Sequence, residues 1–243
     1  MQRFKNKVCL ITGATSGIGR AVAVQMGQEG GCIAVLGRDV ADGREVVREI
    51  TAAGGQAIFL RADVGRDASL KAAVGKVLAA WGRVDVLVSN AALMTFQPLL
   101  KLDPKDWDEV MNVNLRALFR LTQLCLPHMK RGAIVAVSSV HAHQTTPNVV
   151  PYAASKGAVE AFVRGLSLEI PHTHARINAV APGAVDTPML WSNPNVKSGK
   201  EKITGQVGTP LELAAAICFM ASPEANFING TTLVVDGGRL ASL

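Results

Sequence analysis

Short apolar segments alternate with longer amphipathic segments along almost the whole chain, and this alternation limits the fold more than any other feature of the sequence. The apolar segments are almost continuously hydrophobic, which is typical of parallel strands that helices cover on both faces. Strands are expected at residues 8–11, 32–36, 57–60, 84–88, 133–137, 176–180 and 232–235, and helices near 17–29, 39–53, 67–81, 104–130, 152–170 and 210–221. The pattern predicts an α/β fold with a doubly wound, seven-stranded parallel sheet in a single domain over residues 1–243.

One segment, residues 187–209, breaks this alternation because it is rich in Pro, Ser, Asn, Lys and Gly. A long loop inside a compact domain often covers a bound ligand. We therefore expect a substrate loop here; a flexible insertion with no role in binding is the alternative.

Composition and charge argue against several classes of function. The net charge is +6, but the basic residues form no run and only one tyrosine and three tryptophans are present, so we expect no nucleic-acid partner. A modest positive excess suits an anionic, phosphate-bearing ligand. The four cysteines lie far apart without metal-ligand spacing, which predicts reduced thiols and no metal site. No signal-peptide pattern and no apolar segment of roughly 20 residues is present, so we expect a cytoplasmic protein without a membrane partner.

A glycine-rich turn follows the first expected strand, in Thr12-Gly13-Ala14-Thr15-Ser16-Gly17-Ile18-Gly19. Glycines at such a turn allow the backbone to approach a pyrophosphate closely. The helix that follows presents unpaired N–H groups and the positive end of its dipole to the same anion. The turn therefore predicts a site for the phosphates of a dinucleotide.

Tyr152, the only tyrosine in the chain, stands four residues before Lys156. Four residues make about one helical turn, so the phenol and the ammonium share a face of the helix. A phenol has a pKa near ~10, and a fixed positive charge beside it lowers that value. The pair is therefore a candidate for reversible proton transfer to an oxygen. Taken alone, the pair is better explained as a partly buried tyrosine beside a solvated lysine, and the rest of the chain reverses this preference.

The T-G-x-x-x-G-x-G spacing of the turn and the Tyr-x-x-x-Lys pair together resemble the short-chain dehydrogenase/reductase family, in its short, single-domain branch. Further segments match the family: Asn90-Ala91, Asn114, Ser139 thirteen residues before Tyr152, Pro182-Gly183 with Thr187, and Thr232 to Gly238. The resemblance covers essentially the whole chain. It implies a Rossmann-like fold and hydride transfer between a nicotinamide cofactor and a ketone, aldehyde or alcohol.

The resemblance also assigns roles to four catalytic residues. Tyr152 would be the general acid and base, and Ser139 would donate a hydrogen bond to the substrate oxygen. Lys156 would lower the pKa of the tyrosine and bind the nicotinamide ribose. Asn114 would hold a water that links Lys156 to solvent. Ser138 is a weaker match for the serine, because its distance from Tyr152 is one residue too long.

The residue after the second expected strand bears on the choice of cofactor. Gly37 stands where NAD-preferring relatives usually have Asp, and Arg38 could pair with a 2′-phosphate. Asp39 could accept from the ribose, although a role as helix N-cap is simpler. NADP(H) is therefore favoured, with NAD(H) as the alternative. The resemblance implies cofactor contacts at Gly13, Thr15, Ser16, Gly17, Ile18, Gly19, Arg38, Asp63, Val64, Asn90, Ala91, Tyr152, Lys156, Pro182, Gly183, Val185 and Thr187.

The substrate is expected beside Ser139 and Tyr152, in a largely apolar site. Candidate substrate contacts are Met94, His141, Val149 and Trp191, although a loop histidine is often only solvated. Ala92 departs from the family pattern, which has glycine there, so this turn must avoid positive φ or bear strain.

Three other functions compete with a carbonyl reductase. Residues 138–141 and 152–157 are similar to the same stretches of some sugar (aldose) dehydrogenases, but such similarity says little about substrate. A non-catalytic dinucleotide-binding regulator is a second alternative, and the retained catalytic residues argue against it. An extended-type epimerase or dehydratase is the third, and the short chain disfavours it. The family resemblance also implies a homotetramer, formed through the helices near 104–130 and 152–170.

Overall fold

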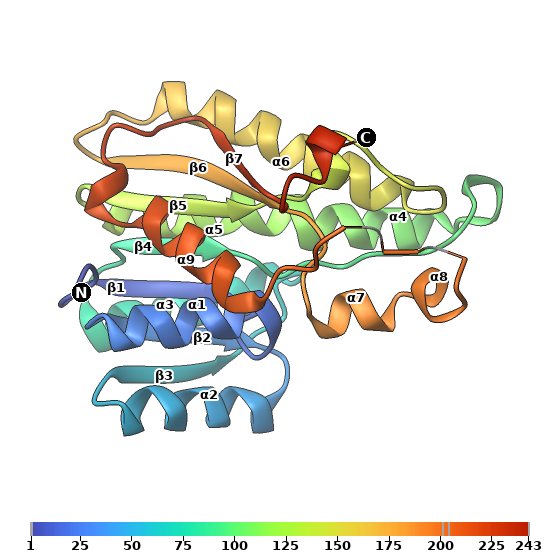
Figure 1. Cartoon of the computed structure of the whole chain (residues 1–243). Helices are drawn as coiled ribbons and strands as arrows, with labels where there is room; N and C mark the ends of the chain where they lie inside the picture. The colour runs from blue at the N-terminus through green and yellow to red at the C-terminus, as the bar shows by residue number, and fades with distance from the viewer. Residues whose placement is uncertain (1, 201, 204, 243) are drawn as a thin grey trace.

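Seven parallel strands form one sheet in the order β3-β2-β1-β4-β5-β6-β7 in the computed structural model, which describes residues 2–200, 202–203 and 205–242 (Figure 1). The strands are β1 (Val8–Thr12), β2 (Cys32–Gly37), β3 (Gln56–Arg61), β4 (Val86–Ser89), β5 (Gly132–Val137), β6 (Ala175–Pro182) and β7 (Thr232–Val235). Every residue of β1, β5 and β6 is buried, because helices cover both faces of the sheet. The predicted doubly wound, seven-stranded parallel sheet is confirmed.

Two groups of helices cover the two faces. Apolar residues of α1 (Gly17–Gln28), α2 (Val40–Ala52) and α9 (Pro210–Ala221) pack in one core cluster, and Figure 1 shows α1 and α9 in front of the sheet. Residues of α3 (Asp67–Trp81), α5 (Ala117–Cys125) and α6 (Val150–Glu169) pack in a second cluster. Short 3₁₀ turns complete the chain: η1 (Leu99–Lys101), η3 (Leu126–His128), η4 (Val140–Ala142), η5 (Pro223–Ala225) and η6 (Leu240–Ser242).

The helix predicted near residues 104–130 is interrupted. The chain forms α4 (Pro104–Met111), then a π-helical turn, η2 (Asn112–Arg116), and then α5. A π-helical turn inside an α-helix often marks a functional site. Asn114, a predicted catalytic residue, lies within it.

The segment 187–209 is more regular than the sequence predicts. Two short helices occupy its first half, α7 (Pro188–Ser192) and α8 (Pro194–Lys197). Each begins with a proline, and the side chains of Thr187 and Asn193 accept hydrogen bonds from backbone N–H groups in the first turns. The expectation of an irregular segment is therefore wrong for residues 188–197, because capping residues within the segment support helical turns.

The sheet order places a binding cleft at one edge. The chain runs from β1 outward to β2 and β3, and then returns to place β4 on the other side of β1. Ligands of doubly wound folds bind at the carboxyl ends of the strands, where the order reverses. Among the described residues, no helix is long and apolar enough to cross a membrane.

Candidate active site

A cleft of about 880 Å³ opens at the carboxyl edge of the sheet. Its described lining includes most of the predicted cofactor contacts and three of the catalytic residues: Gly13, Thr15, Ser16, Gly17, Ile18, Arg38, Asp63, Val64, Asn90, Ala91, Ser139, Tyr152, Lys156, Pro182, Gly183, Val185 and Thr187. It also includes Met94 and His141. Four predicted site residues are not among the described lining residues: Gly19, Asn114, Val149 and Trp191.

The glycine-rich turn is packed directly against the end of β4. Gly13 and Gly17 have φ values of 62° and 51°, which favour glycine. A Cβ on Gly19 would lie only 2.2 Å from the carbonyl oxygen of Gly13. Gly19 therefore allows close packing of the turn, and its contact with a cofactor stays a prediction.

Asn90 holds this turn in place. Its Nδ2 donates to the carbonyl oxygens of Thr12 (3.0 Å) and Gly13 (3.2 Å). The Thr12 hydroxyl in turn accepts from the backbone N–H groups of Asn90 and Ala91, at 2.9 and 3.0 Å. These four bonds join the ends of β1 and β4 beneath the cleft. Ala92 is not among the residues with positive φ, so its turn avoids the strained conformation, as the sequence requires.

One end of the cleft, where the adenosine of a dinucleotide was expected, combines Thr15, Gly37, Arg38 and Asp39. A Cβ on Gly37 would lie 2.4 Å from Cγ2 of Thr15, so a side chain there would require Thr15 to move. The carboxylate of Asp39 accepts from the backbone N–H of Asp42 at 2.9 Å and caps α2, as the simpler prediction stated. Arg38 is exposed at the same end of the cleft.

Tyr152, Lys156 and Ser139 meet at the opposite end, all three less than 9 % exposed. The first two lie on α6, and Ser139 lies two residues after the end of β5. Burial raises the pKa of Tyr152 to about 12, and a hydrogen bond with Ser139 acts in the opposite direction. Burial lowers the pKa of Lys156 to about 8.

Lys156 was predicted to lower the pKa of the Tyr152 phenol, but it is not among the groups that shift this pKa. Its Nζ donates to the carbonyl oxygen of Val137 at 2.7 Å and lies 5.4 Å from the centre of the Tyr152 ring. Ser139, rather than Lys156, is the neighbour that lowers the pKa of the phenol. Burial outweighs this hydrogen bond, because the low dielectric of the interior disfavours the charged form of the phenol.

Asn114 is buried behind the cleft, and its side-chain amide is engaged by the protein. Oδ1 accepts from the N–H of Leu93 at 2.7 Å, and Nδ2 donates to the carbonyl oxygen of Leu93 and to Oγ of Ser155, each at 2.9 Å. Ser155 Oγ donates to the carbonyl oxygen of Tyr152 at 2.7 Å. Asn114 therefore ties the loop after β4 to the catalytic helix, and its water-holding role stays a prediction.

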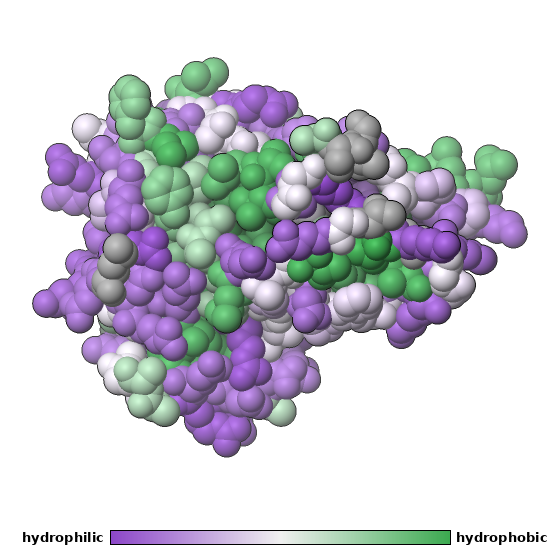
Figure 2. All heavy atoms as spheres, in the orientation of Figure 1, coloured by the Kyte–Doolittle hydropathy of each residue, from purple (hydrophilic) through white to green (hydrophobic). Residues whose placement is uncertain are grey.

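The substrate end has a mixed lining. His141 lies edge-on to Tyr152 with ring centres 5.6 Å apart, and its Nδ1 is 3.0 Å from Oγ1 of Thr145. Val149 is fully buried, and Trp191 is turned toward Asp186, to which its Nε1 donates at 2.6 Å. Met189 and Leu190 line the cleft instead. Figure 2 shows apolar side chains gathered just above α7, bordered by hydrophilic ones.

Arg239 is a cleft residue that the sequence did not reveal. It lies in the turn after β7, where the carboxylate of Asp236 accepts from the N–H groups of Gly238 (2.9 Å) and Leu240 (2.8 Å). Asp236 packs against Gly183 at the base of the cleft, because a Cβ on Gly183 would lie 2.8 Å from Cα of Asp236. The sequence Asp236-Gly237-Gly238-Arg239 alone does not show that the fold brings this turn to the cleft.

Comparisons with known proteins agree with this geometry. A family model described as Enoyl-(Acyl carrier protein) reductase matches residues 13–239. A 3-oxoacyl-[acyl-carrier-protein] reductase of Thermotoga maritima is 37% identical, covering 97% of this chain and 98% of that protein. A 3beta-hydroxysteroid dehydrogenase of Eggerthella lenta is 35% identical, covering 97% and 94%.

Solved structures give the same result. A 7 alpha-hydroxysteroid dehydrogenase complexed with NADH and 7-oxo glycochenodeoxycholic acid has a TM-score of 0.90 and 30% identity, covering 98% of this chain and 96% of that one. A short-chain dehydrogenase from Burkholderia cenocepacia, in complex with NADP, has a TM-score of 0.90 and 32% identity, covering 97% and 98%. The chain therefore belongs to the short-chain dehydrogenase/reductase family and is an oxidoreductase that acts on CH–OH or C=O groups.

Proposed function

We propose that this protein is an NADP(H)-dependent carbonyl reductase in which Tyr152 is the proton donor. The observation that carries the proposal is the burial of Tyr152, Ser139 and Lys156 together in the cleft. The complexes of similar proteins with NADH and with NADP support a nicotinamide dinucleotide as the cofactor. When bound, that cofactor supplies or accepts the hydride.

The protonation state of the phenol favours reduction near neutral pH. With a pKa raised to about 12, Tyr152 is neutral and can donate its proton to the oxygen of a carbonyl as the oxygen becomes an alkoxide. The Ser139 hydroxyl, which interacts with the phenol, would stabilise the same oxygen. Alcohol oxidation needs the phenolate, which burial disfavours, so it requires a higher pH.

Lys156 is proposed to bind the nicotinamide ribose. One of its ammonium protons is used by the carbonyl oxygen of Val137, which leaves two donors. With a pKa of about 8, the ammonium is mostly charged at neutral pH. The bond to Val137 fixes the side chain at the end of β5, so its position is set before the cofactor binds.

The preference for NADP(H) rests on the adenosine end of the cleft. Gly37 offers no carboxylate to accept from a 2′-hydroxyl, and Thr15 packs into the space that a side chain at this position would occupy. Asp39 is used as the cap of α2. Arg38 is then the side chain best suited to the 2′-phosphate, since a guanidinium binds phosphate with two hydrogen bonds.

The test is to titrate the purified protein with NADPH and NADH in parallel by calorimetry, and then to screen carbonyl substrates. The panel comprises cyclopentanone, ethyl acetoacetate and a 3-keto steroid, with aldoses and NADP⁺ as the oxidation arm. Tighter binding of NADPH and turnover of a ketone are expected. Preference for NADH would overturn the cofactor assignment, and turnover of aldoses alone would replace the reductase by a sugar dehydrogenase.

Self-association is a further part of the proposal. Met111, Leu115, Phe119, Ala158 and Phe162 line an open apolar depression on α4, α5 and α6. Separately, Figure 2 shows apolar surface over β7, where Val234 is 40% exposed and the nearby Phe227 98% exposed. Two such faces support a homotetramer. Light scattering should give a tetramer for the wild type and a smaller species for Phe119→Glu.

A further inference from the structure

One buried carboxylate near the active site has no part in the proposed proton transfer. Glu160 is 4% exposed and lies on α6, four residues after Lys156, which itself lies four residues after Tyr152. Residues at this spacing share one face of a helix. The face that α6 turns to the end of β5 thus presents a phenol, an ammonium and a carboxylate in sequence.

Glu160 contacts both ends of the segment that carries Ser139. The hydroxyl of Ser138, the preceding residue, donates to Oε1 of Glu160 at 2.8 Å. Nε2 of His143 lies 3.3 Å from the same oxygen. Ser138 directly follows β5, and His143 ends the η4 turn, so one carboxylate oxygen holds both ends of residues 138–143.

The middle of this segment contains the catalytic hydroxyl. Oγ of Ser139 accepts from the backbone N–H of His141 at 3.2 Å, which caps the η4 turn. The same hydroxyl is hydrogen-bonded to the Tyr152 phenol. The position of Ser139 relative to the phenol therefore depends on where the η4 turn sits, and Glu160 fixes the two ends of that turn against α6.

A buried carboxylate is energetically unfavourable compared with an apolar side chain of similar size. Burial of a charge destabilises a fold unless hydrogen bonds and opposite charges offset it, and a well-packed apolar residue often serves stability better. A charge that is kept at a place where strand, turn and catalytic helix meet is better explained by the geometry that it imposes.

We propose that Glu160 is a positioning residue that holds Ser139 in hydrogen-bonding geometry with Tyr152, by anchoring Ser138 and His143 to the catalytic helix. The inference rests on the proposed function, because its readout is carbonyl reduction. It concerns how well the reacting groups are aligned, and cofactor binding is expected to be unaffected, since Glu160 is not among the described residues that line the cleft.

The experiment compares Glu160→Gln with Glu160→Leu, using the best ketone of the panel above and NADPH. Gln keeps an oxygen that can accept from Ser138, whereas Leu removes both contacts. Glu160→Leu should lower kcat by about 10- to 100-fold, the cost of a misplaced reacting group, with little change in KM. Glu160→Gln should retain most of the activity. Glu169→Gln, at the exposed end of the same helix, is the matched control and should behave as the wild type.

A second readout separates alignment from folding. If hydride transfer slows, the isotope effect with 4-deuterated NADPH should rise toward its intrinsic value in Glu160→Leu. Unfolding of part of the sample would lower activity without moving that ratio. An unchanged kcat and isotope effect in folded Glu160→Leu would overturn the proposal.

The two contacts of Glu160, with Ser138 and with His143, can also be tested without substituting Glu160 itself. Ser138→Ala and His143→Ala each remove one anchor, and both should lower kcat even if Glu160→Leu does not fold. Wild-type activity for these two variants would also overturn the proposal. Failure of the wild type to reduce any carbonyl would instead refute the proposed function, so the two failures are distinguishable.

Discussion

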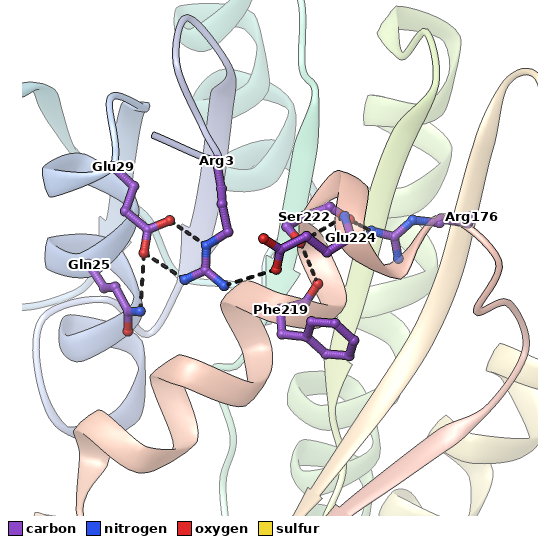
Figure 3. Close-up of polar contacts among 7 residues, drawn as sticks. All are labelled: Arg3, Gln25, Glu29, Arg176, Phe219, Ser222 and Glu224. Carbon is purple, nitrogen blue, oxygen red and sulfur yellow. Dashed lines mark hydrogen bonds and ion pairs between the residues drawn. The ribbon is translucent and has the colours of Figure 1, made fainter. Parts of the chain in front are cut away.

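Ionisable groups at the two edges of the sheet, where the strands begin (the amino edge) and where they end (the carboxyl edge), have pKa values set by different causes. At the amino edge, Arg3 donates to both carboxylate oxygens of Glu29 at 2.6 Å, and it lies 3.8 Å from Glu224 (Figure 3). Burial acts to raise the pKa of Glu29, but hydrogen bonds from Arg3 and Gln25 outweigh it and lower the value. At the carboxyl edge, burial dominates and disfavours the charged forms of Tyr152 and Lys156.

This difference indicates that the charged groups at the amino edge stabilise the fold, whereas those at the carboxyl edge have properties suited to catalysis. Paired charges at the amino edge join the N-terminal segment, α1 and η5, three elements far apart in sequence. Buried groups without an opposite charge at the carboxyl edge have shifted pKa values, which is typical of functional sites. We expect substitutions at the amino edge to change stability alone, and those at the carboxyl edge to change activity.

The largest effect is expected for Tyr152→Phe. Removing the proton donor should lower kcat by about 10²- to 10⁴-fold, while the unfolding midpoint in urea stays close to that of the wild type. Steady-state ketone reduction and urea titration check both. Because Tyr152 is the only tyrosine, this variant also leaves no phenol absorbance in the protein. Substantial residual activity would show that another group donates the proton.

Glu29→Ala should have the reverse effect. The variant leaves the partly buried Arg3 with only the more distant Glu224, and we expect a loss of about 1–3 kcal/mol in the free energy of unfolding. The kcat and KM values should remain those of the wild type, because Glu29 lies at the far edge of the sheet. Gln25→Ala, which removes only a neutral hydrogen bond to Glu29 at 3.2 Å, is the milder control. A change in kcat would contradict the expectation that substitutions at the amino edge change stability alone.

Lys156→Met should lower activity but stabilise the protein near neutral pH. The folded protein releases the Lys156 proton near pH 8 and the unfolded chain near 10.5, so between these values the unfolded state binds more protons. Stability conferred at this site therefore rises with pH, and below pH 8 the buried ammonium destabilises the fold. The variant removes that penalty, for a gain on the order of 2 kcal/mol after the lost bond to Val137 is counted.

Urea midpoints of wild type and Lys156→Met, measured from pH 7 to 10.5, check this prediction. The stability difference should be largest at the low end and should fall as the pH rises toward the high end, where only the lost bond to Val137 remains. A constant difference would show that the ammonium is not the cause. Lys71→Met, at an exposed i,i+4 pair with Asp67, is the control in which no such trend is expected.

Arg38→Ala sharpens the comparison, because this arginine lies at the carboxyl edge but is exposed. Its charge should affect neither stability nor chemistry, only the choice of cofactor. We expect NADPH to bind about tenfold more weakly, with NADH unchanged, in calorimetric titrations. Asp42→Asn should have the smallest effect, a slight strengthening of NADPH binding, since its carboxylate lines the same end of the cleft. Equal weakening of both cofactors by Arg38→Ala would contradict the assignment.

Much of the fold followed from patterns that are local in sequence. Near-continuous apolar runs located all seven strands, because a strand that helices cover on both faces has few polar positions. The helix near 104–130 was mispredicted as continuous, because its apolar pattern does not reveal a π-helical turn at Asn112–Arg116. The helices α7 and α8 were missed because their turns depend on caps from Thr187 and Asn193.

The sequence by itself determined the pairing of Tyr152 with Lys156, since helical spacing places both on one face, and the conformation of the glycine-rich turn. Only the tertiary structure decided which groups surround them. It assigned Asn114 to Leu93 and Ser155, closed Gly37 against Thr15, and placed Glu160 beneath Ser138. It also set the pKa values of Tyr152 and Lys156, because burial depends on elements that the chain brings together from distant positions.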